Sequence, residues 1–361
     1  MKYIDRLNSI IEKIDSNFID FSAVRIHPTA PTQVSSEFLT NKEQGDWAEM
    51  TLLNVINSQS NNYIAVKYGR DDSIIAGEDG FKDFYESYQQ ELDSIGKRPD
   101  ILIFDKSDFP YDELNISNFS LELLDEIVPK AKCGIEVRSS AFLIDKYEKY
   151  MSEKTNDAIQ QVFRIKNEII QNYGPLLMKK DMHLFKLILE LELENIHICS
   201  FRCPSWKTTS ELQTLSNLLK KLKEALTSIT KRTYLSITPK VEDIKVVYNW
   251  IKKYNVPHYY VQVFFDKAFG ISFEKILNLV SQPTLEGKEY YIEGDIKNQN
   301  KLTIKINAHN EANVLTRIEI PSHHSEMREL NRGRLLYYVK FDNSVCYINK
   351  DEFEKLLGFR F

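Results

Sequence analysis

The spacing of hydrophobic residues predicts a chain in which helices and strands alternate over most of its length. Apolar side chains recur every three or four positions, which is typical of one face of an amphipathic helix. This spacing predicts helices at residues 3–18, 41–57, 81–92, 155–171, 182–193, 210–230 and 240–254. Compact runs rich in β-branched and aromatic residues predict strands at 98–105, 133–142, 196–201, 232–237 and 258–265. Interleaving of this kind is typical of an α/β fold.

The pattern changes near residue 288, where apolar and polar residues begin to alternate with a period of two. This alternation predicts strands at 289–296, 301–308, 316–321 and 335–342, followed by a helix at 352–357. We therefore expect three parts: an N-terminal helix and loop at 1–40, an α/β core with helical insertions at 41–285, and a mostly β C-terminal region at 286–361.

Length and composition indicate an ordinary globular protein. The 361 residues, of which 42% are hydrophobic, are enough to bury a full core. No run approaches the roughly 18 apolar residues of a membrane span, and the first residues lack the pattern of a secretion signal. The four cysteines lack the spacing of a zinc site or a disulfide framework. We expect a cytoplasmic protein that does not enter a membrane.

The net charge of −5 counts against nucleic-acid binding, because contact with phosphates requires lysine and arginine. It does not exclude such a partner, since basic residues can be concentrated in one cleft of an otherwise acidic surface. The sequence also lacks a G-x-x-x-x-G-K-[ST] loop, a G-x-G-x-x-G turn and a G-x-S-x-G elbow. Nucleotide hydrolysis, dinucleotide chemistry and α/β-hydrolase chemistry therefore lack their usual motifs.

Two acidic residues and one basic residue stand on neighbouring predicted strands. Pro99 and Asp100 open one strand, and Glu136 and Arg138 lie in the next. Alternate side chains of a strand share a face, so Glu136 and Arg138 point the same way, whereas Ile135 and Val137 point into the core. Two carboxylates and a cation are what metal-assisted phosphodiester hydrolysis requires. The pattern alone is equally compatible with a loop aspartate and a surface ion pair.

This pattern resembles that of the PD-(D/E)XK nucleases. The resemblance implies an α/β core with a mixed central sheet flanked by helices, and Mg²⁺ held by Asp100 as the bridging ligand and Glu136 as the second ligand. The lysine of that family is replaced here by Arg138, which is too basic to take a proton. Arg138 can still orient the attacking water or hold the phosphate in the transition state.

The helix predicted at 41–57 carries Glu49 on a face that is otherwise apolar, where a carboxylate needs a partner. In many PD-(D/E)XK enzymes a glutamate on the helix before the core strands reaches the metal. The resemblance thus implies that Glu49 is a further metal ligand. The alternative is that Glu49 lies at the edge of the apolar face and reaches solvent.

Lys240 follows Thr238 and Pro239, which are typical of a helix N-cap and first helical residue. A cation in the first turn of a helix is unfavourable to the helix dipole. A catalytic or DNA-binding role, in which Lys240 contacts a phosphate or supplies the amine that Arg138 does not, would explain this placement. The alternative is a solvated lysine paired with Glu242 or Asp243.

The segments GIEVRSS, TPKVED and YYVQVFFDKAFGISFE together resemble type II restriction endonucleases of the AccI kind, over roughly residues 40–280. This resemblance implies a homodimer that cuts a short palindromic site in double-stranded DNA with Mg²⁺, and a cognate DNA methyltransferase in the same system. Arginine commonly reads guanine, and basic side chains in two polar segments are candidates for DNA binding. They are Arg202, Lys207, Arg328, Arg332 and Arg334.

Two other functions remain open at this point. The first is a nuclease of the same fold that acts in repair or in the processing of mobile-element DNA. The second is a non-catalytic DNA-binding protein, which the presence of Arg138 in place of lysine makes conceivable. Cleavage without sequence specificity would favour the first, and loss of metal binding would favour the second.

Overall fold

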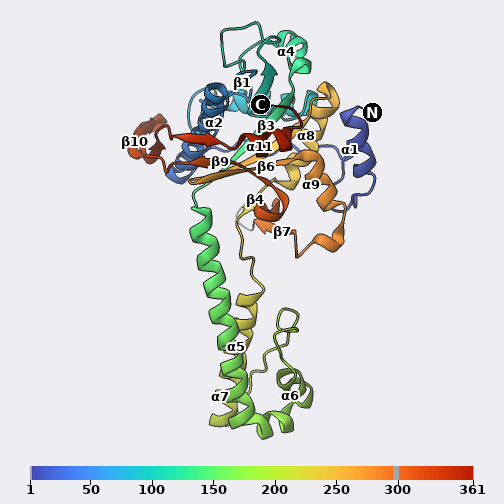
Figure 1. Ribbon diagram of the computed structural model, residues 1–361. Coiled ribbons are helices and arrows are strands. Elements are labelled where there is room, and N and C mark those ends of the chain that lie inside the picture. The colour runs from blue at the N-terminus through green and yellow to red at the C-terminus, as the bar shows by residue number, and fades with distance from the viewer. Residues whose placement is uncertain (1, 296–300, 361) are drawn as a thin grey trace. The chain divides into compact units, whose positions relative to one another are not determined.

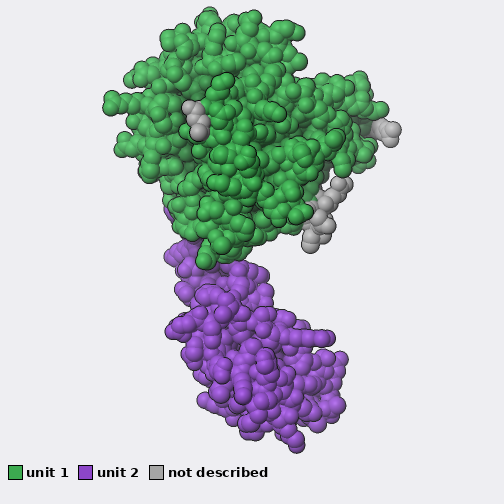
Figure 2. Space-filling model, turned by 90° about the vertical axis from the view of Figure 1, so that its right-hand side faces the viewer, with its two compact units in different colours: residues 1–144, 236–361 green, residues 145–235 purple. Residues whose placement is uncertain are grey.

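The chain forms two compact units in the computed structural model, which describes residues 2–295 and 301–360. One unit comprises Met1–Ile144 and Ser236–Phe361, and the other comprises Asp145–Leu235 (Figure 2). The boundaries predicted after residues 40 and 285 both fall within the first unit. None of the described helices combines the length and the apolar character that a membrane crossing requires.

The first unit is built on a seven-stranded sheet with the order β1-β2-β3-β5-β6-β9-β12 (Figure 1). Its strands are β1 (Tyr63–Lys67), β2 (Ile101–Asp105), β3 (Cys133–Ser140), β5 (His258–Phe264), β6 (Lys267–Ser272), β9 (Asn313–Ile318) and β12 (Cys346–Ile348). Only the pairing of β3 with β5 is parallel among these described strands, and their other pairings are antiparallel. The sheet is therefore mixed, which confirms the predicted α/β class.

Both faces of this sheet are covered by side chains from helices. On one face, Trp47 and Ile56 of α2 (Ser36–Gln59) and Phe353 of α11 (Lys350–Leu357) join a core that includes Ile135 and Val137 of β3. On the other face, Trp250 of α8 (Val241–Tyr254) packs near His258 of β5, with ring centroids 6.0 Å apart. Glu136 points to this second face and is also buried.

The remaining helices of the first unit are short, and two smaller sheets accompany them. The helices are α1 (Tyr3–Ile11), α3 (Phe81–Ser94), α4 (Leu121–Ile127), α9 (Phe273–Val280) and α10 (Ala308–Glu311). One small sheet has the order β4-β8-β7, formed by β4 (Ser236–Ile237), β8 (Lys301–Asn307) and β7 (Tyr290–Asp295). The other is the antiparallel pair of β10 (His323–Leu330) and β11 (Arg334–Phe341).

The second unit is helical and has its own apolar core. It consists of α5 (Ile144–Lys180), which begins at the boundary of the unit, α6 (Met182–Leu189) and α7 (Ser210–Ile229). The strand predicted at 196–201 is wrong, because this segment forms turns. A strand would place Ile196 and Ile198 on one face, whereas Ile196 is buried in the helical core and Ile198 is 83% exposed. Of the strand predicted at 232–237, only Ser236–Ile237 pairs with another strand.

Several predicted helix ends were also wrong. Helix α1 ends at Ile11 and not at residue 18, since the buried Ile14 continues the apolar spacing through a turn. Helix α2 begins earlier than predicted, at Ser36, because the hydroxyl of Ser35 accepts a hydrogen bond from the backbone of Phe38. Helix α8 begins at Val241 with Lys240 as its N-cap, two residues later than the cap expected at Thr238.

Candidate active site

The pairing of β2 with β3 brings Asp100 and Glu136 together. Ile101 lies opposite Ile135 in the antiparallel register, so Asp100 lies beside the segment of β3 that carries Glu136. The Asp100 carboxylate accepts a hydrogen bond from the backbone nitrogen of Val137 at 2.6 Å. The two acidic residues that the sequence predicted thus lie side by side, Asp100 just before β2 and Glu136 within β3.

Both carboxylates line a cavity of about 560 Å³ between the N-terminal half of α2 and strand β3. Arg138 and Glu49, which the sequence also predicted, line the same cavity. Lys97 lines it as well and was not predicted from the sequence. Lys42, Asp46 and Asp72 line it too, so the cavity gathers five acidic side chains, Asp100 among them, and three basic ones.

Glu136 is a buried carboxylate whose two oxygens have different surroundings. It is 1% exposed, and its Oε1 lies 2.5 Å from Lys97 Nζ and 3.0 Å from Arg138 Nη2. Its Oε2 is buried and has no hydrogen-bond partner among the described residues. A buried carboxylate oxygen without a partner is costly, so a ligand for this atom is expected.

Asp243, in the first turn of α8, completes a quartet of alternating charges with Glu136, Lys97 and Arg138. Its Oδ2 lies 3.1 Å from Lys97 Nζ and 2.5 Å from Arg138 Nη2. Burial disfavours its charge, but Lys97 and then Arg138 outweigh burial and hold the pKa of the Asp243 carboxyl below its ordinary value. Asp243 therefore remains ionised and fixes both cations.

Lys97 and Arg138 both remain protonated in this arrangement. Burial opposes the charge of each, but Asp243 and Glu136 raise the pKa of both groups above their ordinary values. Neither residue is therefore suited to remove a proton from water. Both are suited to hold Glu136 in place and to face negative charge in the cavity.

A glycine places Lys97 beside α8. Gly96 has a φ of +83°, and a Cβ at this position would lie 2.2 Å from the backbone oxygen of Val246. The next residue, Lys97, donates its backbone N–H to the same oxygen at 2.9 Å. The sequence signal that indicates this lysine is a Gly-Lys pair just before the Pro99-Asp100 motif.

The backbone of Gly69 is packed directly against Asp100. The backbone nitrogens of Tyr68 and Gly69 donate to the Asp100 carbonyl oxygen at 2.9 and 3.0 Å. A Cβ on Gly69 would lie 3.1 Å from Asp100 Cα and 3.2 Å from Asp100 Oδ1. A side chain at residue 69 would therefore displace the carboxylate.

Replacing Gly69 with alanine should lower the DNA cleavage rate on the order of tenfold, because a small displacement of a reacting group is enough to slow catalysis. Single-turnover cleavage would measure the effect, and the unfolding temperature would show whether the fold is kept. Gly294→Ala is the matched control, since of the residues that the structure describes its Cβ would meet only Leu302, at 3.8 Å. Equal cleavage rates for the two variants would contradict this role of Gly69.

Glu49, on α2, interacts electrostatically with the same site but lies closest to a different cation. Its side chain is 21% exposed, and its Oε2 lies 3.7 Å from Lys67 Nζ. Burial, with further contributions from Asp46, Asp72 and Glu136, raises the pKa of Glu49 to about 7. Asp100 also has a pKa well above its ordinary value, because of burial and the nearby Glu136 and Glu49 carboxylates.

The donors in the cavity fit a hard divalent cation such as Mg²⁺. Over residues 2–295 and 301–360, no group of three or more His, Cys, Asp or Glu side chains is arranged to hold a metal by itself. Mg²⁺, however, is usually held by one or two carboxylates and keeps several waters. Asp100 and the unpartnered Oε2 of Glu136 supply such a pair, and a cation would relieve the repulsion that raises the pKa of Asp100. Glu49 as a third ligand remains a prediction.

In the metal-free protein, we expect the free energy of unfolding to fall as the pH rises from 4.5 to about 7. Folded Glu49 keeps its proton in this range whereas unfolded Glu49 releases it, so stability decreases by up to about 1.4 kcal/mol per pH unit. Glu49→Gln should reduce this decrease, as measured by urea unfolding in EDTA. An unchanged pH dependence in the variant would show that Glu49 titrates normally.

The other residues predicted to act on DNA lie outside this cavity. Lys240 is exposed, and its charge helps to lower the pKa of Asp243. Arg328 pairs with Glu78 at 2.7 Å, and Arg334 donates to the side chain of Gln33. Arg202 and Lys207 belong to the second unit, and the side chain of Arg332 lies outside what the structure describes. Their roles in DNA binding or catalysis remain predictions.

Comparison with known proteins agrees with the resemblance seen in the sequence. The model of the AccI restriction endonuclease family matches residues 1–360. No curated protein and no solved structure matches the chain. Because the family match extends over almost the entire chain, this protein belongs to the AccI restriction endonuclease family and is a site-specific deoxyribonuclease that binds DNA.

Proposed function

We propose that this restriction endonuclease makes Mg²⁺-dependent double-strand cuts at a short palindromic DNA site, using a core of the PD-(D/E)XK type. The observation that carries the proposal is that Asp100, just before β2, lies beside Glu136 of β3 in a cavity that Lys97 and Arg138 also line. Restriction endonucleases generally use a divalent metal, and the unpartnered Glu136 Oε2 supports such a ligand here.

Asp100 and Glu136 would hold the Mg²⁺, which when bound supplies an activated water and offsets negative charge on the phosphate. The chain's own cations position these ligands. Lys97 and Arg138 share Glu136 Oε1, and Oε2 has no hydrogen-bond partner in the described part of the chain. Because both cations stay protonated, they are suited to hold the scissile phosphate and stabilise the charge that develops on it.

Lys97 is the residue that takes the role of the lysine replaced by Arg138 in the sequence motif. Its ammonium lies 2.5 Å from the second carboxylate of the proposed metal site, although it comes from the turn before β2 and not from β3. Lys240, the other candidate for this role, does not line the cavity. We therefore assign the role of the motif lysine to Lys97 and not to Lys240.

The proposed enzyme acts as a homodimer, because two identical subunits related by a twofold axis match the symmetry of a palindromic duplex. Each subunit would cut one strand. A cognate methyltransferase that protects the host site belongs to the same proposal, as does a cytoplasmic location, where host and invading DNA meet the enzyme.

Digestion of unmethylated phage DNA tests the proposed activity. The purified protein is incubated with the DNA in Mg²⁺ or in EDTA, and the products are separated on a gel. Discrete fragments in Mg²⁺ alone are expected. A smear would indicate a nuclease without sequence specificity, and intact DNA from a folded protein that still binds DNA would indicate a non-catalytic DNA-binding protein.

A further inference from the structure

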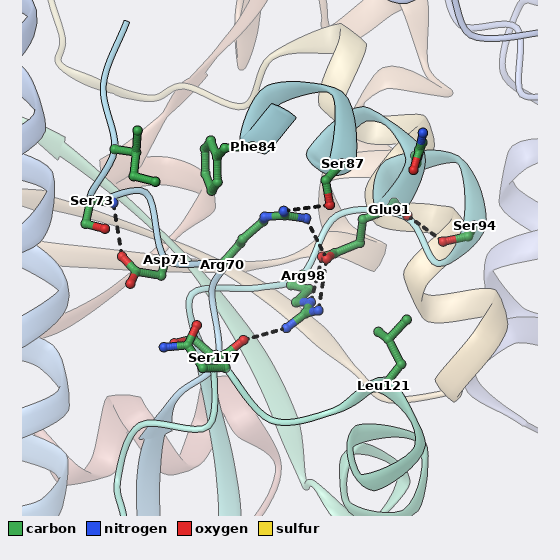
Figure 3. A pocket seen from close by; sticks show the side chains of 13 residues that line it. Arg70, Asp71, Ser73, Phe84, Ser87, Glu91, Ser94, Arg98, Ser117 and Leu121 are labelled. Carbon is green, nitrogen blue, oxygen red and sulfur yellow. Dashed lines mark hydrogen bonds and ion pairs between the residues drawn. The ribbon is translucent and has the colours of Figure 1, made fainter. Parts of the chain in front are cut away.

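A second hollow lies beside the catalytic cavity and is not part of the proposed metal site. It has a volume of about 630 Å³, and its walls include Arg70, Phe84, Ser87, Glu91 and Arg98 (Figure 3). We refer to it as the Arg70 pocket. Most of its residues come from α3 and from the loop that follows β1.

The Arg70 pocket is connected to the catalytic cavity by shared walls. A smaller hollow of about 230 Å³ is lined by Arg70 and Arg98 together with Lys97 and Asp100. The chain connection is equally short, because Arg70 follows Gly69, whose backbone is hydrogen-bonded to Asp100. A polymer that places one group at Asp100 therefore has a neighbouring group within reach of Arg70.

Arg70 is held in one orientation by the side chains around it. It donates from Nη1 to Glu91 at 2.9 Å and from Nη2 to Ser87 at 3.0 Å. Its guanidinium carbon also lies 5.0 Å from the ring centroid of Phe84 and 5.7 Å from that of Tyr88. A guanidinium has five N–H groups, so these two bonds leave others for a ligand. The group is pre-organised and remains 21% exposed.

Two arginines of this pocket pair with the same carboxylate, that of Glu91. Arg98 also pairs with Glu91, at 2.7 Å, and donates to the backbone oxygen of Ser117. Two guanidinium groups that share one carboxylate leave one positive charge. The Asp71 carboxylate also lines the pocket and balances this charge; it is exposed and accepts a hydrogen bond from the backbone of Ser73 at 3.0 Å.

We propose that the Arg70 pocket binds a DNA backbone phosphate that neighbours the scissile phosphate, with Arg70 as the direct contact. Arg98 is a positioning residue that holds Glu91, which in turn orients Arg70. The N–H groups that the fixed Arg70 guanidinium keeps free suit the oxygens of a phosphodiester. This inference rests on the proposed function, because it places the DNA strand across Asp100.

The salt dependence of DNA binding tests the contact in the full-length protein. A duplex that carries the mapped cut site is titrated with Asp100→Asn protein, with and without Arg70→Ala, over a series of salt concentrations. Losing one phosphate contact should weaken binding at least about tenfold at low salt and reduce the slope of log K against log salt by about 1. Arg70→Lys, which keeps the charge, should largely keep the slope.

Arg25→Ala is the matched control, because Arg25 is also 21% exposed and ion-paired, to Asp93 at 3.0 Å, but does not line either hollow. Its slope should equal that of the parent protein. A duplex in which a methylphosphonate replaces the contacted phosphate lacks the charge at that position. It should bind the parent protein more weakly than the unmodified duplex does, but should bind Arg70→Ala no more weakly. An unchanged slope in a folded Arg70→Ala protein would overturn this inference alone, whereas failure of the wild-type protein to cut DNA would overturn the proposed function.

Discussion

Asp100→Asn and Glu136→Gln should each reduce DNA cleavage on the order of a thousandfold, because each removes a carboxylate from the site where transition-state charge is stabilised. The two variants should differ in stability. Asp100 has a raised pKa, so its ionised form is unfavourable in the metal-free fold, and the asparagine variant should unfold at a higher temperature in EDTA. Glu136→Gln should unfold at a lower temperature, since Lys97 and Arg138 lose an anionic partner. Single-turnover cleavage in Mg²⁺ and thermal unfolding in EDTA measure both effects.

The control for this pair is Asp105→Asn, at the other end of β2. Asp105 pairs with Lys132 at 2.5 Å and does not line the catalytic cavity. Its cleavage rate should equal that of the wild-type protein. If Asp100→Asn cut DNA at the wild-type rate, Asp100 would not be a metal ligand, and the proposed reaction would need another site.

The sequence predicted Asp100, Glu136 and Arg138, because short patterns along single strands determine where these side chains lie. Alternation along 133–142 predicted that Glu136 and Arg138 share a face, and the structure confirms this with an ion pair of 3.0 Å. The Pro-Asp motif before an apolar run likewise predicted Asp100. These residues lie on strands that are adjacent in the sheet, so local patterns were sufficient.

Lys97 and Asp243 could not be predicted in the same way, because their positions depend on tertiary packing. Asp243 reaches Arg138 only because α8 covers the face of the sheet that carries Glu136. Lys97 reaches both acidic groups only because Gly96 allows the backbone to approach Val246. Neither of these packing contacts produces a periodic hydrophobic pattern in the sequence around Asp243 or Lys97.

The alternating pattern of the last quarter predicted strands but not the sheets they join. Strand β9 extends the same sheet that carries β3, as does β12, which was not predicted, whereas β7 and β8 pair with β4 in a separate sheet. Strand β6 was missed, since it is short and contains Gly270, where a Cβ would lie 2.5 Å from Leu315. Which strands pair depends on packing of this kind, which hydropathy does not encode.

Lys97→Met should lower the cleavage rate about a hundredfold or more, because it removes a cation that both orients Glu136 and faces the scissile phosphate. It should also lower the unfolding temperature, since a buried carboxylate loses its closest partner. Lys97→Arg separates the two effects. It keeps the charge and much of the stability, yet its longer, planar group cannot reproduce the 2.5 Å contact of the ammonium with Glu136, so cleavage should remain slow.

Lys132→Met is the matched control for Lys97→Met, because it breaks another lysine–aspartate pair that lies outside the cavity.

Lys240→Ala tests the alternative that Lys240, and not Lys97, takes the role of the motif lysine. If Lys97 positions the reacting groups, Lys240→Ala should leave the single-turnover rate nearly unchanged and at most weaken DNA binding. Slow cleavage by Lys240→Ala together with normal cleavage by Lys97→Arg would be the opposite result. It would show that Lys240, the N-cap of α8, takes the role of the motif lysine. In that case, the quartet of Glu136, Asp243, Lys97 and Arg138 would serve to join β3 to α8, with Arg138 as its one cation still able to act on the phosphate.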